Sequence, residues 1–279
     1  MELDRSPLGH IVLVGTSTLR NTISKSNLLA SLGFTSDDIR SIVGIVEKCN
    51  SNSEECSGDE AAKALDAVTR LTLNYPYDMS AELNGMRPWL EAFKSGDSKA
   101  LGRVILLETD TVSGRAAGDV LEGVFRQYGV SVDRETVSRL GIPGFFVEGI
   151  NNLLSMIRRV AQDIIEAGHC PLINLTGGFK PESAVALVSS IGYIPLGYYI
   201  HESFRDVIYI PLYPLADKSG ARSVISRGID RGEWIGFRDP PEWLTCLAST
   251  LVPPGKAAIG REEIQLSHDI IEIIKTLSR

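Results

Sequence analysis

Three short apolar runs, each closed by a turn of small or hydroxyl-bearing residues, constrain the fold of this chain most strongly. The runs are HIVLVG at 10–15, RVILL at 103–107 and PLINL at 171–175. Such runs are typical of strands buried on both faces of a parallel sheet. A helical pattern follows each turn, over 21–32, 113–128 and 181–191. Strands that alternate with helices predict an α/β protein with a Rossmann-like, mostly parallel sheet and helices on both faces.

The rest of the chain supplies further helices and a distinct C-terminal part. We expect helices over 37–48, 60–73, 81–93 and 146–167, a short strand over 130–133, and an antiparallel pair of edge strands over 194–201 and 206–212. The composition changes near Ala216, after which we expect a strand over 223–229 and helices over 240–249 and 261–277. The sequence therefore predicts one Rossmann-like domain over 1–213. Residues 214–279 are expected to form a small C-terminal domain, or a dimer or lid element.

Composition and charge exclude several classes of protein. The 279 residues are 43% hydrophobic and 23% charged, which is typical of a folded chain with a sizeable core. The net charge of −7 argues against a protein that coats nucleic acid through a broad basic surface, so DNA binding is not expected. A local basic pocket is still compatible with this net charge. The N-terminus has no apolar signal segment, and no apolar run approaches the ~20 residues needed to span a bilayer. We expect a cytoplasmic protein without a membrane partner.

Cysteine, histidine and glycine patterns narrow the chemistry. The four cysteines form no CxxC pair, and free thiols are the favoured interpretation, although Cys49 and Cys56 flank a polar loop that a disulfide could close. The four histidines lack the spacing of a metal site, so neither a metal nor a cofactor is expected. No Walker A motif is present, and no GxGxxG follows the first strand, which disfavours a dinucleotide-dependent oxidoreductase.

The turns after the three strands are the candidate site, because ligands of such sheets bind outside the carboxyl ends of the strands. GTST at 15–18 offers backbone N–H groups and hydroxyls to an anion, although N-capping explains such residues equally well. TGGFK at 176–180 is more specific, because its two glycines let a backbone approach a ligand closely. A cation such as Lys180 at a helix start is disfavoured unless an anion neutralises it, the alternative being a solvated lysine. Arg115 starts another helix in the same way.

Three motifs in this order carry a resemblance to a known family. VGTS at 14–17, TDTxxGR at 109–115 and NLTGGFKPE at 174–182 resemble the CRISPR-associated Rossmann-fold (CARF) proteins, and within them the stand-alone ring nucleases. The likeness covers residues 9–213. It implies a homodimer whose symmetric cleft binds a cyclic oligoadenylate, with cyclic tetra-adenylate the expected ring. It also implies metal-independent cleavage to linear di-adenylate with 2′,3′-cyclic phosphate ends, which switches off type III CRISPR antiviral signalling.

The resemblance assigns roles to residues of the turns. Ser17 would position the scissile phosphate or the ribose 2′-OH, Lys180 would neutralise charge in the transition state, and Arg115 would grip a phosphate. For Asp110, capping of the following turn is an equally good interpretation. The other residues expected at the ligand are Thr16, Thr18, Thr109, Gly114, Thr176, Gly177, Gly178 and Phe179.

Alternative functions stay open at this point. A non-catalytic CARF sensor would hold the ring intact and control a C-terminal effector or DNA-binding element, and an unrelated phosphate-binding protein would prefer mononucleotides. Arg261 and His268 have the spacing of a HEPN ribonuclease motif, but the C-terminal part is too short for that helical domain. A winged-helix tail is disfavoured because the last helix has few basic residues. No motif decides between rings of four and six adenylates.

Overall fold

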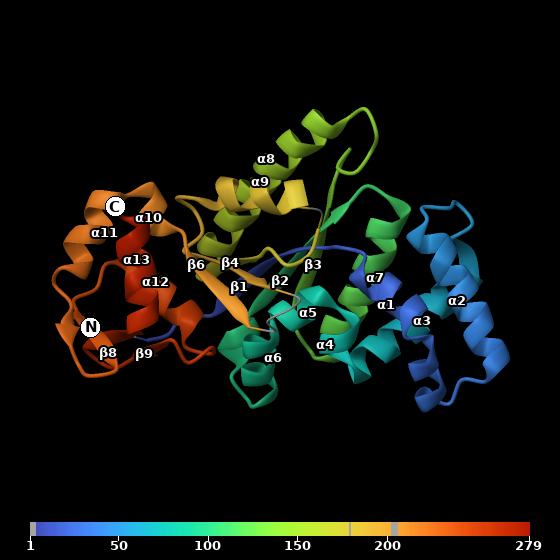
Figure 1. Cartoon of the computed structure of the whole chain (residues 1–279), viewed down its shortest axis with the longest axis horizontal. Coiled ribbons are helices and arrows are strands. Elements are labelled where there is room, and N and C mark those ends of the chain that lie inside the picture. The colour runs from blue at the N-terminus through green and yellow to red at the C-terminus, as the bar shows by residue number, and fades with distance from the viewer. Residues whose placement is uncertain (1–3, 179, 202–205) are drawn as a thin grey trace.

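A six-stranded sheet forms the centre of the protein (Figure 1). The computed structural model describes residues 4–178, 180–201 and 206–279, and of Lys180 only the backbone. The strand order is β3-β2-β1-β4-β5-β6, and all neighbours are parallel except the antiparallel pair of β5 and β6. The predicted Rossmann-like α/β fold is confirmed. The strands are β1 (Leu8–Leu13), β2 (Arg103–Thr109), β3 (Val132–Val137), β4 (Cys170–Asn174), β5 (Leu196–Ile200) and β6 (Val207–Pro211).

Helices cover both faces of this sheet because successive strand residues point to opposite sides. Val12 and Leu106 belong to the apolar core beneath the first group of helices, whereas Ile11 and Leu107 belong to the core beneath α8 (Phe146–Glu166) and α9 (Lys180–Ser190). The first group comprises α1 (Ser17–Ser24), α2 (Ser36–Asn50), α3 (Gly58–Asn74), α4 (Pro76–Met79), α5 (Ala81–Gly85), α6 (Arg87–Lys94) and α7 (Val112–Gln127), with 3-10 helices η1 (Ser26–Leu32) and η2 (Ser98–Leu101).

The direction of the winding changes between β1 and β4. From β1 the chain moves outward through β2 to β3, and α8 then carries it back to β4 on the other side of β1. Ligands of doubly wound sheets bind in the crevice at such a switch point, outside the carboxyl ends of the strands. In the β1–β4 register Val12 lies opposite Asn174, so the turns that follow the two strands lie side by side.

The C-terminal part adds a second, antiparallel sheet with the order β7-β8-β10-β9. The expected strand over 223–229 is wrong: α11, capped by the Asp217 side chain, continues through Ile225, and a strand begins at Ile229 after a turn. The expected helix over 261–277 is wrong in its first half, because residues 263–267 alternate buried and half-buried positions and form a strand. The elements are α10 (Tyr213–Ala216), α11 (Lys218–Ile225), β7 (Ile229–Asp230), β8 (Trp234–Arg238), α12 (Glu242–Leu251), β9 (Ala257–Ile259), β10 (Glu263–Ser267) and α13 (His268–Leu277).

The C-terminal part forms one end of the molecule and α2 and α3 the other (Figure 1). Its apolar residues continue the core of the first helix group, and the Trp89 indole N–H of α6 donates to the Thr250 carbonyl oxygen of α12 at 2.9 Å. Because one apolar core runs through both parts, the domain boundary between 213 and 214 stays a prediction. Within the described residues, no helix has both the length and the apolar character needed to cross a membrane.

The four cysteines are paired, so the favoured interpretation of free thiols is wrong. Cys49 is bonded to Cys56 and Cys170 to Cys246. Their Cα–Cα distances of 4.9 and 5.5 Å lie within the range that a disulfide bridges. The first bond closes the loop between α2 and α3. The second joins the start of β4 to α12, and so ties the central sheet to the C-terminal part.

Candidate functional site

The turns after β1 and β4 meet at the switch point. A Cβ atom placed on Gly15 would lie 2.9 Å from the Gly178 nitrogen, and one on Gly177 would overlap the Leu13 carbonyl oxygen. Gly178 has a φ of +80°, a left-handed conformation that glycine adopts without strain. Glycines at these positions thus let two backbones pack directly against each other. The glycine pair predicted the close approach of a ligand, and the structure shows the close approach of a neighbouring turn.

A buried carboxylate that the sequence analysis did not identify holds this junction together. Glu82 of α5 is 1% exposed. Its Oε1 accepts the Gly15 backbone N–H at 2.8 Å, and its Oε2 accepts the hydroxyls of Ser17 at 2.8 Å and Ser80 at 2.7 Å. In the sequence Glu82 looks like an ordinary acidic residue in the first turn of a helix. No local pattern reveals a partner 65 positions away.

The Ser17 side chain is held by two hydrogen bonds. It is 8% exposed, and its Oγ also accepts the Ala81 backbone N–H at 3.1 Å. Thr16 occupies the N-cap position of α1, yet its side chain makes no capping hydrogen bond with any described residue, so the capping explanation does not account for it. The Thr18 side chain is fully buried, and its hydroxyl has no hydrogen-bond partner in the described part of the chain.

The turn after β4 is fixed by side-chain amide and hydroxyl bonds. The Asn174 amide N–H donates to the Glu82 carbonyl oxygen at 2.9 Å, and the amide oxygen accepts the Thr176 N–H at 2.9 Å. Thr176 Oγ1 in turn accepts the Ile200 N–H of β5 at 3.2 Å. Phe179 and the Lys180 side chain lie outside the described residues, so their roles stay predictions.

The turn after β2 carries the second predicted cluster. Thr111 caps α7 by accepting the Gly114 N–H at 3.0 Å, and a Cβ on Gly114 would overlap Thr109 Oγ1, so Gly114 is needed for packing. Arg115 and Asp110 form an ion pair at 3.2 Å, with side chains 50% and 37% exposed. Exposed pairs of this kind contribute about 1 kcal/mol or less, so a phosphate could displace the carboxylate at little cost.

A partly buried ion-pair cluster lies next to that turn. Glu108 of β2 is 3% exposed and accepts hydrogen bonds from Arg134 at 2.8 and 3.0 Å and from Thr136 at 3.1 Å. Burial raises the pKa of the Glu108 carboxyl, although Arg134 acts in the opposite direction. The arginine also pairs with Asp119 and Glu122 of α7. The cluster therefore joins β2, β3 and α7 and acts structurally.

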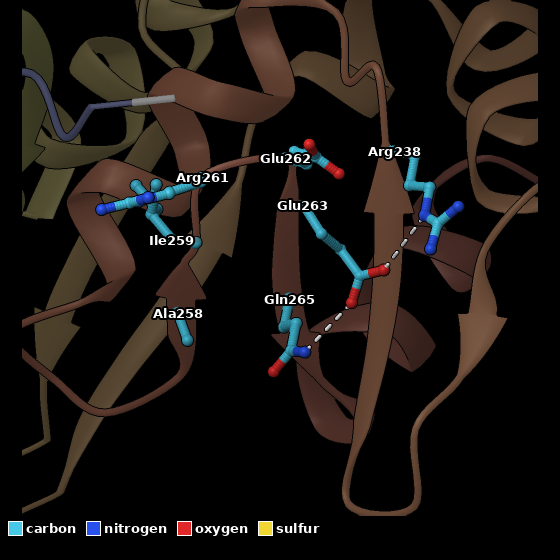
Figure 2. A pocket seen from close by; sticks show the side chains of 8 residues that line it. Arg238, Ala258, Ile259, Arg261, Glu262, Glu263 and Gln265 are labelled. Atoms are coloured by element: carbon cyan, nitrogen blue, oxygen red, sulfur yellow. Dashed lines mark hydrogen bonds and ion pairs between the residues drawn. The ribbon is translucent and has the colours of Figure 1, made fainter. Parts of the chain in front are cut away.

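Two surface hollows lie away from the predicted turns. The first, of about 400 Å³, lies beside β8, β9 and β10, and Arg238 and Gln265 both contact Glu263 there (Figure 2). Arg261 lines it, whereas His268 starts α13 and bonds the Gly232 carbonyl oxygen at 2.8 Å. The second hollow, of about 480 Å³, is lined by 144–148 and 151. Neither contains a predicted site residue.

The fold defines the chain as a Rossmann-like α/β protein whose glycine turns meet at the switch point of the sheet. Residues 77–213 match a family model described as "CRISPR-associated protein (Cas_APE2256)". The match contains Glu82 and the turns after β2 and β4, and it ends two residues after β6. It supports a CRISPR-associated protein.

Proposed function

We propose that this protein is a CARF ring nuclease. As a homodimer it binds cyclic tetra-adenylate in the cleft between its subunits and cleaves the ring to linear di-adenylate with 2′,3′-cyclic phosphate ends. The reaction needs no metal and switches off type III CRISPR signalling. The observation that carries the proposal is the meeting of the Gly15–Ser17 and Gly177–Gly178 turns at the switch point, with the Ser17 hydroxyl held beneath them by Glu82.

The chemistry of the ligand agrees with this arrangement. A ring of four phosphates is a compact polyanion, which a helix N-terminus, glycine turns and a few cations bind without a basic surface. The net charge of −7 is therefore no obstacle. Arg115 supports the proposal as a cation in an exposed, low-cost ion pair. A two-fold ring also matches an isologous dimer, in which both subunits present the same turns.

The proposed cleavage is an in-line displacement within the ring. The ribose O2′ forms a bond to the adjacent phosphorus, and the bond from that phosphorus to the O5′ of the next nucleoside breaks. Lys180 neutralises the charge that develops on the phosphate, and Ser17 orients the reacting ribose. Two such cleavages in one ring yield two linear di-adenylates, each with a 2′,3′-cyclic phosphate.

The proposal is tested by incubating the purified protein with labelled cyclic tetra- and hexa-adenylate in EDTA and resolving the products by chromatography. We expect di-adenylate from the smaller ring, and losses of about 10²-fold or more in Ser17→Ala and Lys180→Ala. Ser41→Ala and Lys63→Ala, which change exposed residues of α2 and α3, serve as matched controls and keep the wild-type rate. Rings left intact after long incubation with stoichiometric protein would contradict nuclease activity.

A non-catalytic sensor is the second candidate, and one observation favours it. Cys170, at the start of the strand that ends in the Thr176–Gly178 turn, is bonded to Cys246 of α12. Ligand binding at that turn could therefore be transmitted through β4 to the C-terminal part. Tight binding without turnover in the same assay would identify this function.

A further inference from the structure

The hydrogen-bonding capacity of the Ser17 hydroxyl is nearly used up in the folded chain. A serine hydroxyl donates one hydrogen bond and accepts two. Ser17 Oγ donates to Glu82 Oε2 at 2.8 Å and accepts the Ala81 N–H at 3.1 Å. One lone pair is left. As long as the Ser17 hydroxyl donates its hydrogen bond to Glu82, Ser17 can accept a hydrogen bond from a ligand but cannot donate one.

The surroundings of Glu82 keep it an acceptor. Its carboxylate receives the Gly15 N–H on one oxygen and the hydroxyls of Ser17 and Ser80 on the other. No lysine or arginine among the described side chains forms an ion pair with it. A Cβ on Gly177 would lie 2.6 Å from its Oε1, so the glycine turn leaves room for the carboxylate. Glu82 is thus enclosed, and Ser17 is its link to the ligand side of the turn.

We infer that Glu82 is a positioning residue that makes Ser17 the acceptor of the ribose 2′-OH proton. The inference rests on the proposed function and deepens it. The bonds from Ser17 to Glu82 and to Ala81 orient the remaining lone pair, and a 2′-OH is a donor that fits it. A non-bridging phosphate oxygen is only an acceptor and does not fit. Of the two roles that the family resemblance left to Ser17, the geometry selects the 2′-OH.

The reaction step is balanced as follows. As O2′ bonds to phosphorus, the 2′-OH proton moves to Ser17 Oγ, and the Ser17 proton moves to Glu82 Oε2. The bond from phosphorus to O5′ breaks, and the departing O5′ takes a proton from water. Glu82 then returns its proton through Ser17 to solvent. A proton acceptor placed in this way contributes about 10²- to 10⁴-fold to a rate.

The test is Glu82→Gln, which keeps the size of the side chain. A glutamine amide would donate to Ser17 Oγ, reverse this hydrogen bond and free the hydroxyl to donate outward. We expect the single-turnover rate on cyclic tetra-adenylate to fall about 10²- to 10⁴-fold while the Kd of the ring is unchanged. In a Ser17→Ala background the same substitution should cause no further loss, because Glu82 acts through Ser17. Glu60→Gln, which changes an exposed residue of α3, is the matched control.

Other outcomes separate this inference from the proposed function. A wild-type protein that leaves the ring intact overturns both. A wild-type protein that cleaves, with Glu82→Gln equally fast or faster, overturns the inference alone, because Ser17 would then act as a donor. Losses that multiply in the double variant also overturn it. If Glu82→Gln does not fold, Glu82→Asp replaces it as the test. The shorter side chain keeps the negative charge but moves it away from Ser17. A loss of about tenfold or more would support the inference, and an unchanged wild-type rate would refute it.

Discussion

Replacing Gly177 by alanine tests the contact between the two turns. The added Cβ would overlap the Leu13 carbonyl oxygen and lie 2.6 Å from Glu82 Oε1, whereas ordinary contacts begin near 3.4 Å. One neighbour is the backbone of β1 and the other a carboxylate held by three hydrogen bonds, so neither can move freely. Overpacking of a rigid site costs typically 1–3 kcal/mol, and we expect about 3 kcal/mol here.

The assay is equilibrium unfolding in urea, followed by far-UV circular dichroism. Gly44→Ala, in the interior of α2, is the matched control: a Cβ there meets no atom within 4 Å. Alanine should therefore stabilise that helix by about 0.5–1 kcal/mol. A Gly177→Ala protein whose free energy of unfolding equals that of the wild type would contradict the tight contact between the two turns. The same substitution should also abolish ring cleavage, because it separates the turn from Glu82 and Ser17.

Three further predictions concern stability. Burial lowers the pKa of His10 from 6.5 to about 3. The unfolded chain therefore binds a proton in that interval, and pH titration of unfolding should show stability falling by about 2 kcal/mol from pH 7.5 to 5 in the wild type, and less in His10→Gln. Arg134→Met should cost about 3 kcal/mol in urea unfolding, because it strands the buried Glu108 carboxylate. Cys246→Ser removes the crosslink to Cys170, 76 positions away, and should lower the free energy of unfolding by about 4 kcal/mol. A wild-type protein that is equally stable with and without reductant would contradict that bond.

The central fold could be predicted from the sequence because its strands are buried on both faces. A short apolar run such as 103–107 is typical of a strand buried on both faces. The helical patterns between the runs act as crossover connections, which parallel strands require. The C-terminal part was predicted less well. Residues 263–267 lie directly before a helix with a strong apolar stripe, and a window that spans both reads as one helix.

The site was predictable to the extent that it lies in the turns. The turns that carry Gly15 and Gly177–Gly178 lie against each other, because parallel strands bring the turns after them to one edge. Glu82 was not predictable, since its role depends on α5 packing against β5 and reaching the turn after β1, a tertiary arrangement that no local pattern encodes. The Cys170–Cys246 pair was missed for the same reason: the two residues lie 76 positions apart, in a strand and a helix that only the folded core brings together. The Cys49–Cys56 pair, seven positions apart, is an alternative that the sequence leaves open.

A crystal structure of the Lys180→Ala protein bound to cyclic tetra-adenylate tests the central claim most directly. The account predicts one ring on the two-fold axis of a homodimer. The Gly15–Ser17 and Gly177–Gly178 turns of both subunits should contact it, and a ribose 2′-OH should lie within hydrogen-bond distance of Ser17 Oγ. A ring bound elsewhere on the protein, or a monomer whose turns stay empty at saturating ligand, would contradict it.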